Sequence, residues 1–139
     1  MISSFKHITY DKESKMAYIY LVDPSQHKVV GTEELEQNDE IVLDLGEGCP
    51  IVGIELEGKA AAKFADLPMY PKYKKVTLKN GSVNYLLKLS NQEIKREIQY
   101  PGINTVTFLF ADQECEEFVG VSVVKSKWYC EAYFLGNNI

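Results

Sequence analysis

Residues 41–56 read IVLDLGEGCPIVGIEL, two runs of strand-forming residues around a turn that contains glycine and proline. This pattern is typical of a β-hairpin, because glycine and proline adopt the backbone conformations that a tight turn needs. Residues 108–123 read FLFADQECEEFVGVSV and repeat the pattern 67 residues later, with Val-Gly at the same place in the second run. At the same offset, Tyr18 falls on Tyr85. The spacing predicts two similar units.

The remaining chain is read as further strands with little helix. Asn80-Gly81 between two β-forming runs predicts a hairpin with a type I′ turn. Residues 59–65 favour a short helix by propensity, and Ser90 with Glu93 has capping-box spacing, which predicts a helix over 90–98 with a strand as the competing alternative. Further strands are predicted at residues 5–10, 16–22, 29–30, 75–79, 82–89, 103–111 and 127–135, with weak helical spacing at 32–39.

The predicted fold class is mainly β, or β-rich α+β, with one or two short helices. We expect two similar antiparallel units of four strands, residues 1–67 and 68–139, related by a pseudo-twofold internal duplication and packed as one compact domain. The expected core residues are Ile8, Tyr18, Val42, Val52, Ile54, Leu86, Phe108, Phe110, Val119 and Val121.

Composition indicates an ordinary globular protein of the cytoplasm. The chain has 139 residues, of which 45% are hydrophobic and 25% charged. Its three cysteines are odd in number and form no CxxC, so neither a disulfide framework nor a zinc site is expected. No apolar run is long enough to span a membrane or direct export. We expect no membrane association and no cofactor.

Charge is unevenly distributed along the chain. Residues 1–67 carry 6 basic and 13 acidic side chains, a net charge of −7, whereas residues 68–139 carry 9 basic and 7 acidic, a net charge of +2. Arg96 is the one arginine. An acidic half repels the phosphate backbone of DNA, and a single guanidinium group allows little base recognition, so DNA is not an expected partner. The expected partner is a basic protein.

The first half also carries a recognisable pattern, Ile8-Thr9-Tyr10-Asp11-Lys12-Glu13, then 17–21, 32–35, 41–44 and 51–56. It resembles the bacterial family called domain of unknown function 2283 over about residues 5–58. The resemblance implies a small β unit without accepted catalytic residues. It also implies a role like that of short bacterial or phage proteins that are partners of small toxins. An insertion around 24–28 and the whole second half depart from the family pattern.

No catalytic or metal-binding pattern stands out in the sequence. Cys49 and Cys115 have glutamates as neighbours, whose charge raises the pKa of a thiol and weakens it as a nucleophile. Asp11 and Glu13 are two carboxylates in one turn, fewer than an oxygen-ligated metal site needs. We therefore expect neither an enzyme nor a metal site.

The first functional hypothesis is a non-catalytic binding protein that neutralises a basic protein such as a toxin, as an immunity protein or antitoxin. Acidic clusters on this protein would mimic phosphate groups, block the site of the toxin that binds phosphate, and speed association. The predicted partner-binding residues are Glu33, Glu34, Glu36, Asp39, Glu40, Glu114, Glu116 and Glu117.

The alternative is a small-ligand sponge that sequesters a nucleotide signal, for example a phage anti-defence protein. Aromatic side chains can stack on a base, and cations can hold a phosphate. The predicted ligand-binding residues are Tyr70, Tyr73, Lys75, Arg96 and Trp128. Homo-oligomerisation stays open under both hypotheses, since edge strands need covering.

Overall fold

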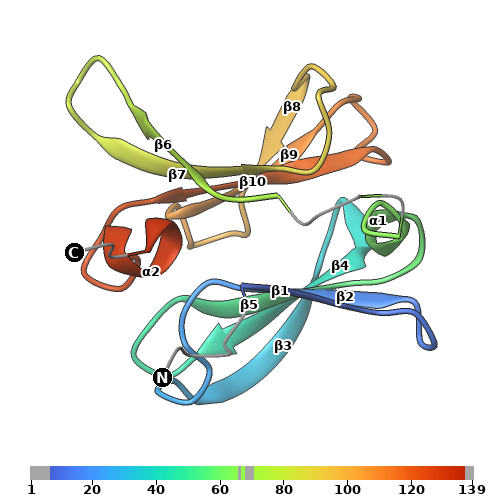
Figure 1. Ribbon diagram of the computed structural model, residues 1–139, viewed down its shortest axis with the longest axis horizontal. Coiled ribbons are helices and arrows are strands. Elements are labelled where there is room, and N and C mark those ends of the chain that lie inside the picture. Colours follow the sequence, from blue (N-terminus) through green and yellow to red (C-terminus); the bar gives the residue numbers. More distant parts are fainter. Residues whose placement is uncertain (1–6, 66, 68–70, 137–139) are drawn as a thin grey trace. The chain divides into compact units, whose positions relative to one another are not determined.

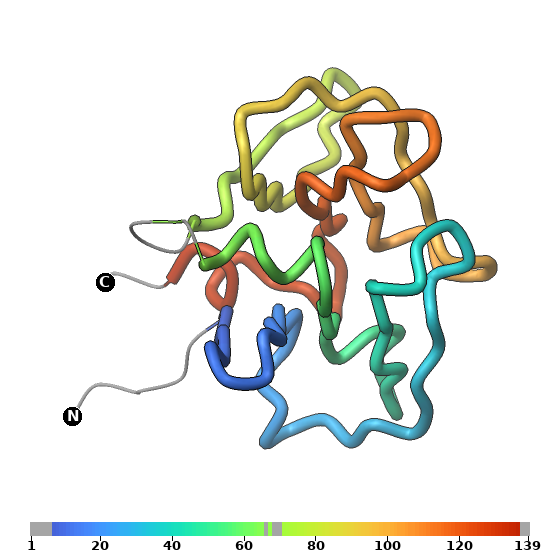
Figure 2. Tube along the Cα trace, turned by 90° about the vertical axis from the view of Figure 1, so that its right-hand side faces the viewer, coloured from blue at the N-terminus to red at the C-terminus, as the bar shows by residue number. Residues whose placement is uncertain are grey.

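The computed structural model describes residues 7–65, 67 and 71–136 (Figure 1). The chain divides into two compact units, Met1–Pro68 and Met69–Ile139. Figure 2 traces the chain through the first unit in blue to green and through the second in yellow to red.

The first unit is one antiparallel five-stranded sheet with a short helix. Its strands lie in the order β1-β2-β5-β4-β3. The elements are β1 (Ile8–Asp11), β2 (Met16–Tyr20), β3 (Val29–Leu35), β4 (Asn38–Gly46), β5 (Ile51–Leu56) and α1 (Gly58–Ala62).

The second unit repeats this arrangement with the order β6-β7-β10-β9-β8. Its elements are β6 (Lys74–Thr77), β7 (Val83–Lys88), β8 (Arg96–Ile98), β9 (Val106–Phe110), β10 (Phe118–Val124) and α2 (Glu131–Leu135). The mainly β fold with two similar antiparallel units is thus confirmed, but each unit has five strands and not four.

The repetition extends to an irregularity in the central strand of each sheet. Val52 in β5 and Val119 in β10 are the extra residues of β-bulges, since the register with the neighbouring strand skips each of them. The Leu21 amide donates to the Val52 carbonyl at 2.9 Å, and the Leu89 amide donates to the Val119 carbonyl at 2.7 Å. The two units therefore share strand order, bulge and bulge partner.

The constant offset of 67 residues is wrong outside β5 and β10. Register places Leu43 and Phe108 at equivalent positions, which are 65 residues apart. It makes Leu86, and not Tyr85, the equivalent of Tyr18, an offset of 68. The turns of the two units differ in length, so one offset cannot align every strand.

The helix predicted over residues 90–98 is wrong, and the weak helical spacing at residues 32–39 does not produce a helix either. Residues 32–39 belong to β3, the turn after it and the start of β4, because pairing with β4 overrides the weak helical spacing. Residues 90–98 form a loop and β8. The Ser90 hydroxyl accepts a hydrogen bond from the Gln92 amide at 3.4 Å and donates one to the Gln92 side chain at 3.0 Å. The Ser90 side chain, which was predicted to cap a helix, therefore stabilises a turn.

The strand predicted over residues 127–135 is wrong too, because α2 occupies its second half. The Ser126 hydroxyl oxygen accepts the amides of Trp128 and Tyr129, each at 3.2 Å, and turns the chain before the helix. Helical spacing then brings Phe134 onto the sheet. Its ring stacks on that of Tyr85, with the centroids 4.9 Å apart, and meets the ring of Tyr73 edge-on at 4.6 Å.

Seven of the ten expected core residues are buried. The exceptions, Tyr18, Val42 and Leu86, are only half-buried. Each has a buried neighbour in its strand, for example Ile19 beside Tyr18, and successive residues of a strand point to opposite faces. The core therefore contains the other seven expected residues and, in place of these three, their neighbours in the same strands.

Candidate functional site

The two sheets differ in charge. Strands β1–β5 contain seven acidic residues and no lysine, arginine or histidine. Strands β6–β10 contain four basic residues and one acidic residue. The acidity of the first half is therefore carried by the sheet itself as well as by its turns.

One face of the first sheet is largely polar. Residues opposite one another in paired strands share a face, and one such row runs from Thr9 through Tyr18, Glu55 and Val42 to Glu34. The next row runs from Tyr20 through Gly53 and Asp44 to Thr32. We call this surface the polar face, and it comprises Thr9, Asp11, Met16, Tyr18, Tyr20, Thr32, Glu34, Val42, Asp44, Gly53 and Glu55.

Tyr18, Asp44 and Glu55 form a cluster in the middle of the polar face. The Tyr18 hydroxyl donates to Oδ2 of Asp44 at 2.5 Å. Asp44 is only 7% exposed, and its other oxygen, Oδ1, has no hydrogen-bond donor among the described residues. Gly53 leaves room for this arrangement, because a Cβ there would overlap the Tyr18 ring. The ring of Tyr20 lies 4.2 Å from that of Tyr18, centroid to centroid.

The cluster holds a proton more tightly than isolated carboxyl groups do. Partial burial raises the pKa of Glu55 to about 7, with further contributions from its hydrogen bond with Asp44 and from the charges of Asp44 and Glu57. Burial raises the pKa of Tyr18 as well, assisted by its hydrogen bond to Asp44. Below about pH 7, Glu55 is protonated and supplies the donor that the buried carboxylate of Asp44 needs.

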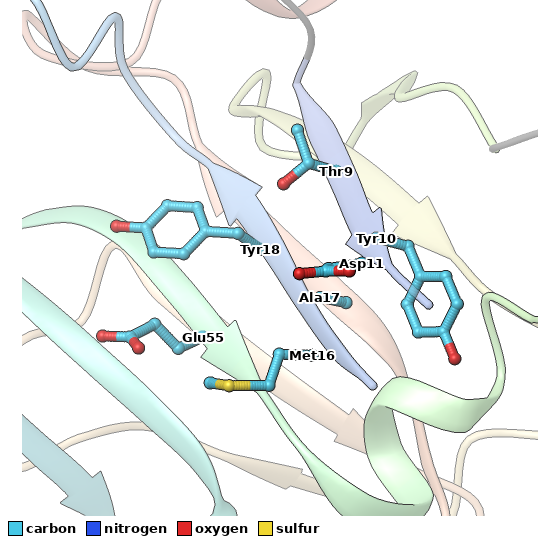
Figure 3. Close-up of a pocket in the computed structure, with 7 residues that line it drawn as sticks. All are labelled: Thr9, Tyr10, Asp11, Met16, Ala17, Tyr18 and Glu55. Carbon is cyan, nitrogen blue, oxygen red and sulfur yellow. The ribbon is translucent and has the colours of Figure 1, made fainter. Parts of the chain in front are cut away.

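A shallow pocket of about 250 Å³ lies beside the cluster, over β1, β2 and β5. Figure 3 shows the side chains of Tyr18 and Glu55 pointing to the same side, whereas the Tyr10 ring points away from them. The lining also includes Thr9, Asp11, Met16 and Ala17. Carboxylates, a hydroxyl and an aromatic ring around an apolar methionine suit a cation on an aliphatic stem.

The structure separates the acidic residues predicted from positions 33–40. Glu34 lies on the polar face, whereas Glu33 pairs with Leu43 and lies on the opposite face. Glu36 and Asp39 are exposed in and after the β3–β4 turn. Glu40 accepts the amides of Lys59 and Ala60 at 3.2 and 3.1 Å, so its carboxylate caps α1.

The second predicted acidic group lies in the turn between β9 and β10. The carboxylate of Asp112 accepts the amides of Glu116 and Glu117 and holds the turn closed. Glu114 and Glu116 are exposed, and Glu117 is half-buried. These three glutamates belong to the second unit and are not part of the polar face.

The residues predicted to bind a nucleotide-like ligand do not form one site in the second unit. Tyr70 lies outside the described residues. Tyr73 is 5% exposed and packs on α2, and Lys75 forms an ion pair of 3.0 Å with Glu131 of that helix. Arg96 lies in β8, at the opposite edge of the sheet from Lys75 in β6, and donates to the Gln113 carbonyl at 2.5 Å.

Trp128, the last residue of that predicted set, is half-buried. The ammonium group of Lys127 lies 5.0 Å from the centre of its indole ring. This cation–π contact stabilises the segment before α2.

Sequence reasoning missed Tyr18, Asp44 and Glu55 as site residues. The available signal was an acidic residue inside each of two apolar strand runs, Leu43-Asp44-Leu45 and Ile54-Glu55-Leu56. Two acidic side chains on neighbouring strands of one hairpin lie close together when both point to the same face of the sheet. In the second unit the equivalent positions hold Leu86, Leu109 and Ser122, so the fold itself does not require the cluster.

Two kinds of site are not found in the part of the chain that the structure describes. No three His, Cys, Asp or Glu side chains are grouped so that they could hold a metal ion. No described helix has the length and apolar character needed to cross a membrane.

Comparison with known proteins identifies the first unit. Residues 7–58 match the family described as protein of unknown function (DUF2283), and this segment includes the whole polar face. The uncharacterized protein YuzE of Bacillus subtilis is 32% identical over 121 residues, which cover 83% of this chain and 84% of the relative. No solved structure matches the chain. The similarity to YuzE spans both units, and the chain belongs to the DUF2283 family of proteins of unknown function.

Proposed function

We propose that this protein is a non-catalytic binding protein that recognises a basic protein, such as a toxin, through the polar face and thereby neutralises it. The observation that carries the proposal is the composition of the first sheet, whose strands hold seven acidic residues and no basic one. A surface of one charge attracts a partner of the opposite charge and raises the rate of association.

The polar face also has the aromatic residues that protein interfaces favour. Tyr18 and Tyr20 are half-buried, so each ring is held in place and keeps part of its surface open. Tyrosine is enriched among residues that dominate binding energy, because it offers a large rigid surface with a polar end. Acidic groups around two fixed rings support a protein partner better than an acidic turn alone would.

The proposal places the protein in the cytoplasm. Cys49, Cys115 and Cys130 form no disulfide bond in the described part of the chain, and a reducing compartment maintains cysteines in this state. Burial raises the pKa of the Cys49 and Cys115 thiols, which makes both weaker nucleophiles and supports a binding role over a catalytic one.

The test of the proposed function compares two charge-reversal variants, one on the polar face of the first sheet and one on its opposite face. Glu34→Lys and Glu33→Lys change adjacent exposed residues of β3 and shift net charge equally, but only Glu34 lies on the polar face. Proteins retained from a bacterial lysate by the tagged wild type at low salt are identified and purified. Each is then titrated with the wild type and both variants.

The expected result is a basic partner whose affinity falls at least tenfold with Glu34→Lys and by less than threefold with Glu33→Lys. Salt should weaken the wild-type complex, because exposed charges are screened. Equal losses in the two variants would show non-specific attraction to acidic protein and would contradict the proposal.

A further inference from the structure

The cluster on the polar face contains a buried acceptor that lacks a donor. Asp44 is more than nine-tenths buried, and its Oδ1 has no hydrogen-bond donor among the described residues, although Oδ2 accepts from Tyr18. A buried carboxylate oxygen without a partner is costly, so such an oxygen marks a place where a proton or a cation belongs. Glu55 supplies that proton while it is protonated.

Building on the proposed function, we infer that Tyr18, Asp44 and Glu55 receive the guanidinium group of an arginine of the basic partner, which replaces the proton shared by Glu55 and Asp44. The exchange is balanced. The arginine enters with its positive charge, Glu55 loses one proton to the solvent, and the carboxyl pair then faces one cation in place of one proton.

The shape of the cluster favours guanidinium over ammonium. Asp44 and Glu55 lie on the same face of the neighbouring strands β4 and β5, and a pair of carboxyl groups suits a planar fork of N–H donors better than it suits a single ammonium group. The rings of Tyr18 and Tyr20 lie beside the pair, and a guanidinium stacks on aromatic rings more readily than an ammonium does.

The neighbouring pocket accommodates the rest of the arginine side chain. Met16 is 37% exposed and lies on the polar face within this pocket of about 250 Å³. An aliphatic stem can lie along the thioether while the charged end reaches Glu55. Asp11, also in the lining, adds negative charge at the entrance.

No basic side chain of the described sheet competes with the incoming arginine for Glu55. Tyr18 and Tyr20 face it from β2, Asp44 faces it from β4, Asp11 lines the same pocket from β1, and Glu57 follows it on its own strand. None of these is basic. Binding should therefore require an ionised Glu55, and a group with a pKa of about 7 makes affinity about tenfold higher at about pH 8 than at about pH 6.

The experiment uses hexa-arginine and hexa-lysine peptides as probes, titrated calorimetrically into the full chain at about pH 6 and about pH 8. Titration in two buffers of different ionisation enthalpy measures the number of protons released. The variants are Glu55→Gln, which keeps the shape but cannot ionise, and Glu33→Gln, which removes a carboxylate from the opposite face.

We expect wild type and Glu33→Gln to bind hexa-arginine more tightly than hexa-lysine, with about one proton released at about pH 6, almost none at about pH 8, and an affinity about tenfold higher at the higher pH. Glu55→Gln should lose the proton release and the preference for arginine. Equal affinity for the two peptides with no proton release would overturn this inference and leave the proposed function standing. If neither peptide binds at either pH, the acidic face does not attract basic chains, and both proposals fall.

Discussion

The raised pKa of Glu55 makes the stability of the first unit depend on pH in an unusual direction. A carboxyl group whose pKa is higher in the folded than in the unfolded state stabilises the fold while it is protonated. The stabilisation is complete below the unfolded value of 4.5 and is lost as pH rises through about 7. Stability should therefore decrease over this range, whereas a salt-bridged carboxylate produces the opposite trend.

The magnitude follows from the size of the pKa shift. A shift from 4.5 to about 7 corresponds to about 3 kcal/mol for a fully shielded group. Glu55 is half-exposed, and solvent screening reduces this to about 1 kcal/mol. Glu55→Gln should remove the dependence, because its amide can donate to Asp44 at every pH. Relative to wild type, it should be about equally stable near pH 4.5 and about 1 kcal/mol more stable near pH 8.

Urea unfolding followed by far-UV circular dichroism at the two pH values measures this difference. Glu34→Gln is the matched control, since it removes a carboxylate from the same face at an exposed position away from the cluster. The reasoning is refuted if Glu55→Gln changes the free energy of unfolding equally at both pH values, or if Glu34→Gln gives the same pH-dependent difference.

Three further substitutions test other contacts by urea unfolding. Tyr18→Phe removes the donor to Oδ2 of Asp44 and should destabilise the first unit by about 1–3 kcal/mol, and no loss would show that the hydrogen bond is unimportant. Gly53→Ala should cost about 1–3 kcal/mol because its methyl group displaces the Tyr18 ring, whereas Gly31→Ala, with open space around it, serves as the tolerant control. Phe134→Ala should destabilise the second unit by about 3–5 kcal/mol, since its ring contacts those of four tyrosines, and a smaller loss would mean that α2 packs weakly.

The sequence was sufficient to predict elements whose signal is local. The hairpins around residues 46–50 and Asn80-Gly81 are confirmed, because turn residues between β-forming runs dictate them without help from the rest of the chain. The type I′ turn predicted for Asn80-Gly81 is wrong, since that turn needs positive φ at both residues and only Gly81 of the pair has it. Most of strand β3, of which only residues 29–30 were predicted, and helix α2 were missed for the opposite reason. Pairing with β4 makes an acidic segment a strand, and packing of Phe134 on the sheet makes an aromatic segment a helix.

The site was harder to predict than the fold. A cluster such as Tyr18, Asp44 and Glu55 depends on which residues share a sheet face, and a register error of one residue moves a side chain to the other face. The expectation that Tyr18 lies in the core contained this error. Acidic residues grouped in sequence, such as Glu33 and Glu34, were separated by the same alternation.

The bulges give the chemistry of the polar face an unexpected basis. Side chains of a strand alternate between its two faces, and Val52 is one extra residue in this alternation in β5. It therefore determines the face to which every later side chain of β5 points. Deleting Val52 would reverse the alternation after it, and Gly53 and Glu55 would then lie on the opposite face of the sheet. In the second unit the same deletion at Val119 would turn inward only the small hydroxyl of Ser122 in place of a carboxylate. The acidity of one face of the first sheet thus depends on the number of residues in a strand as much as on their identity.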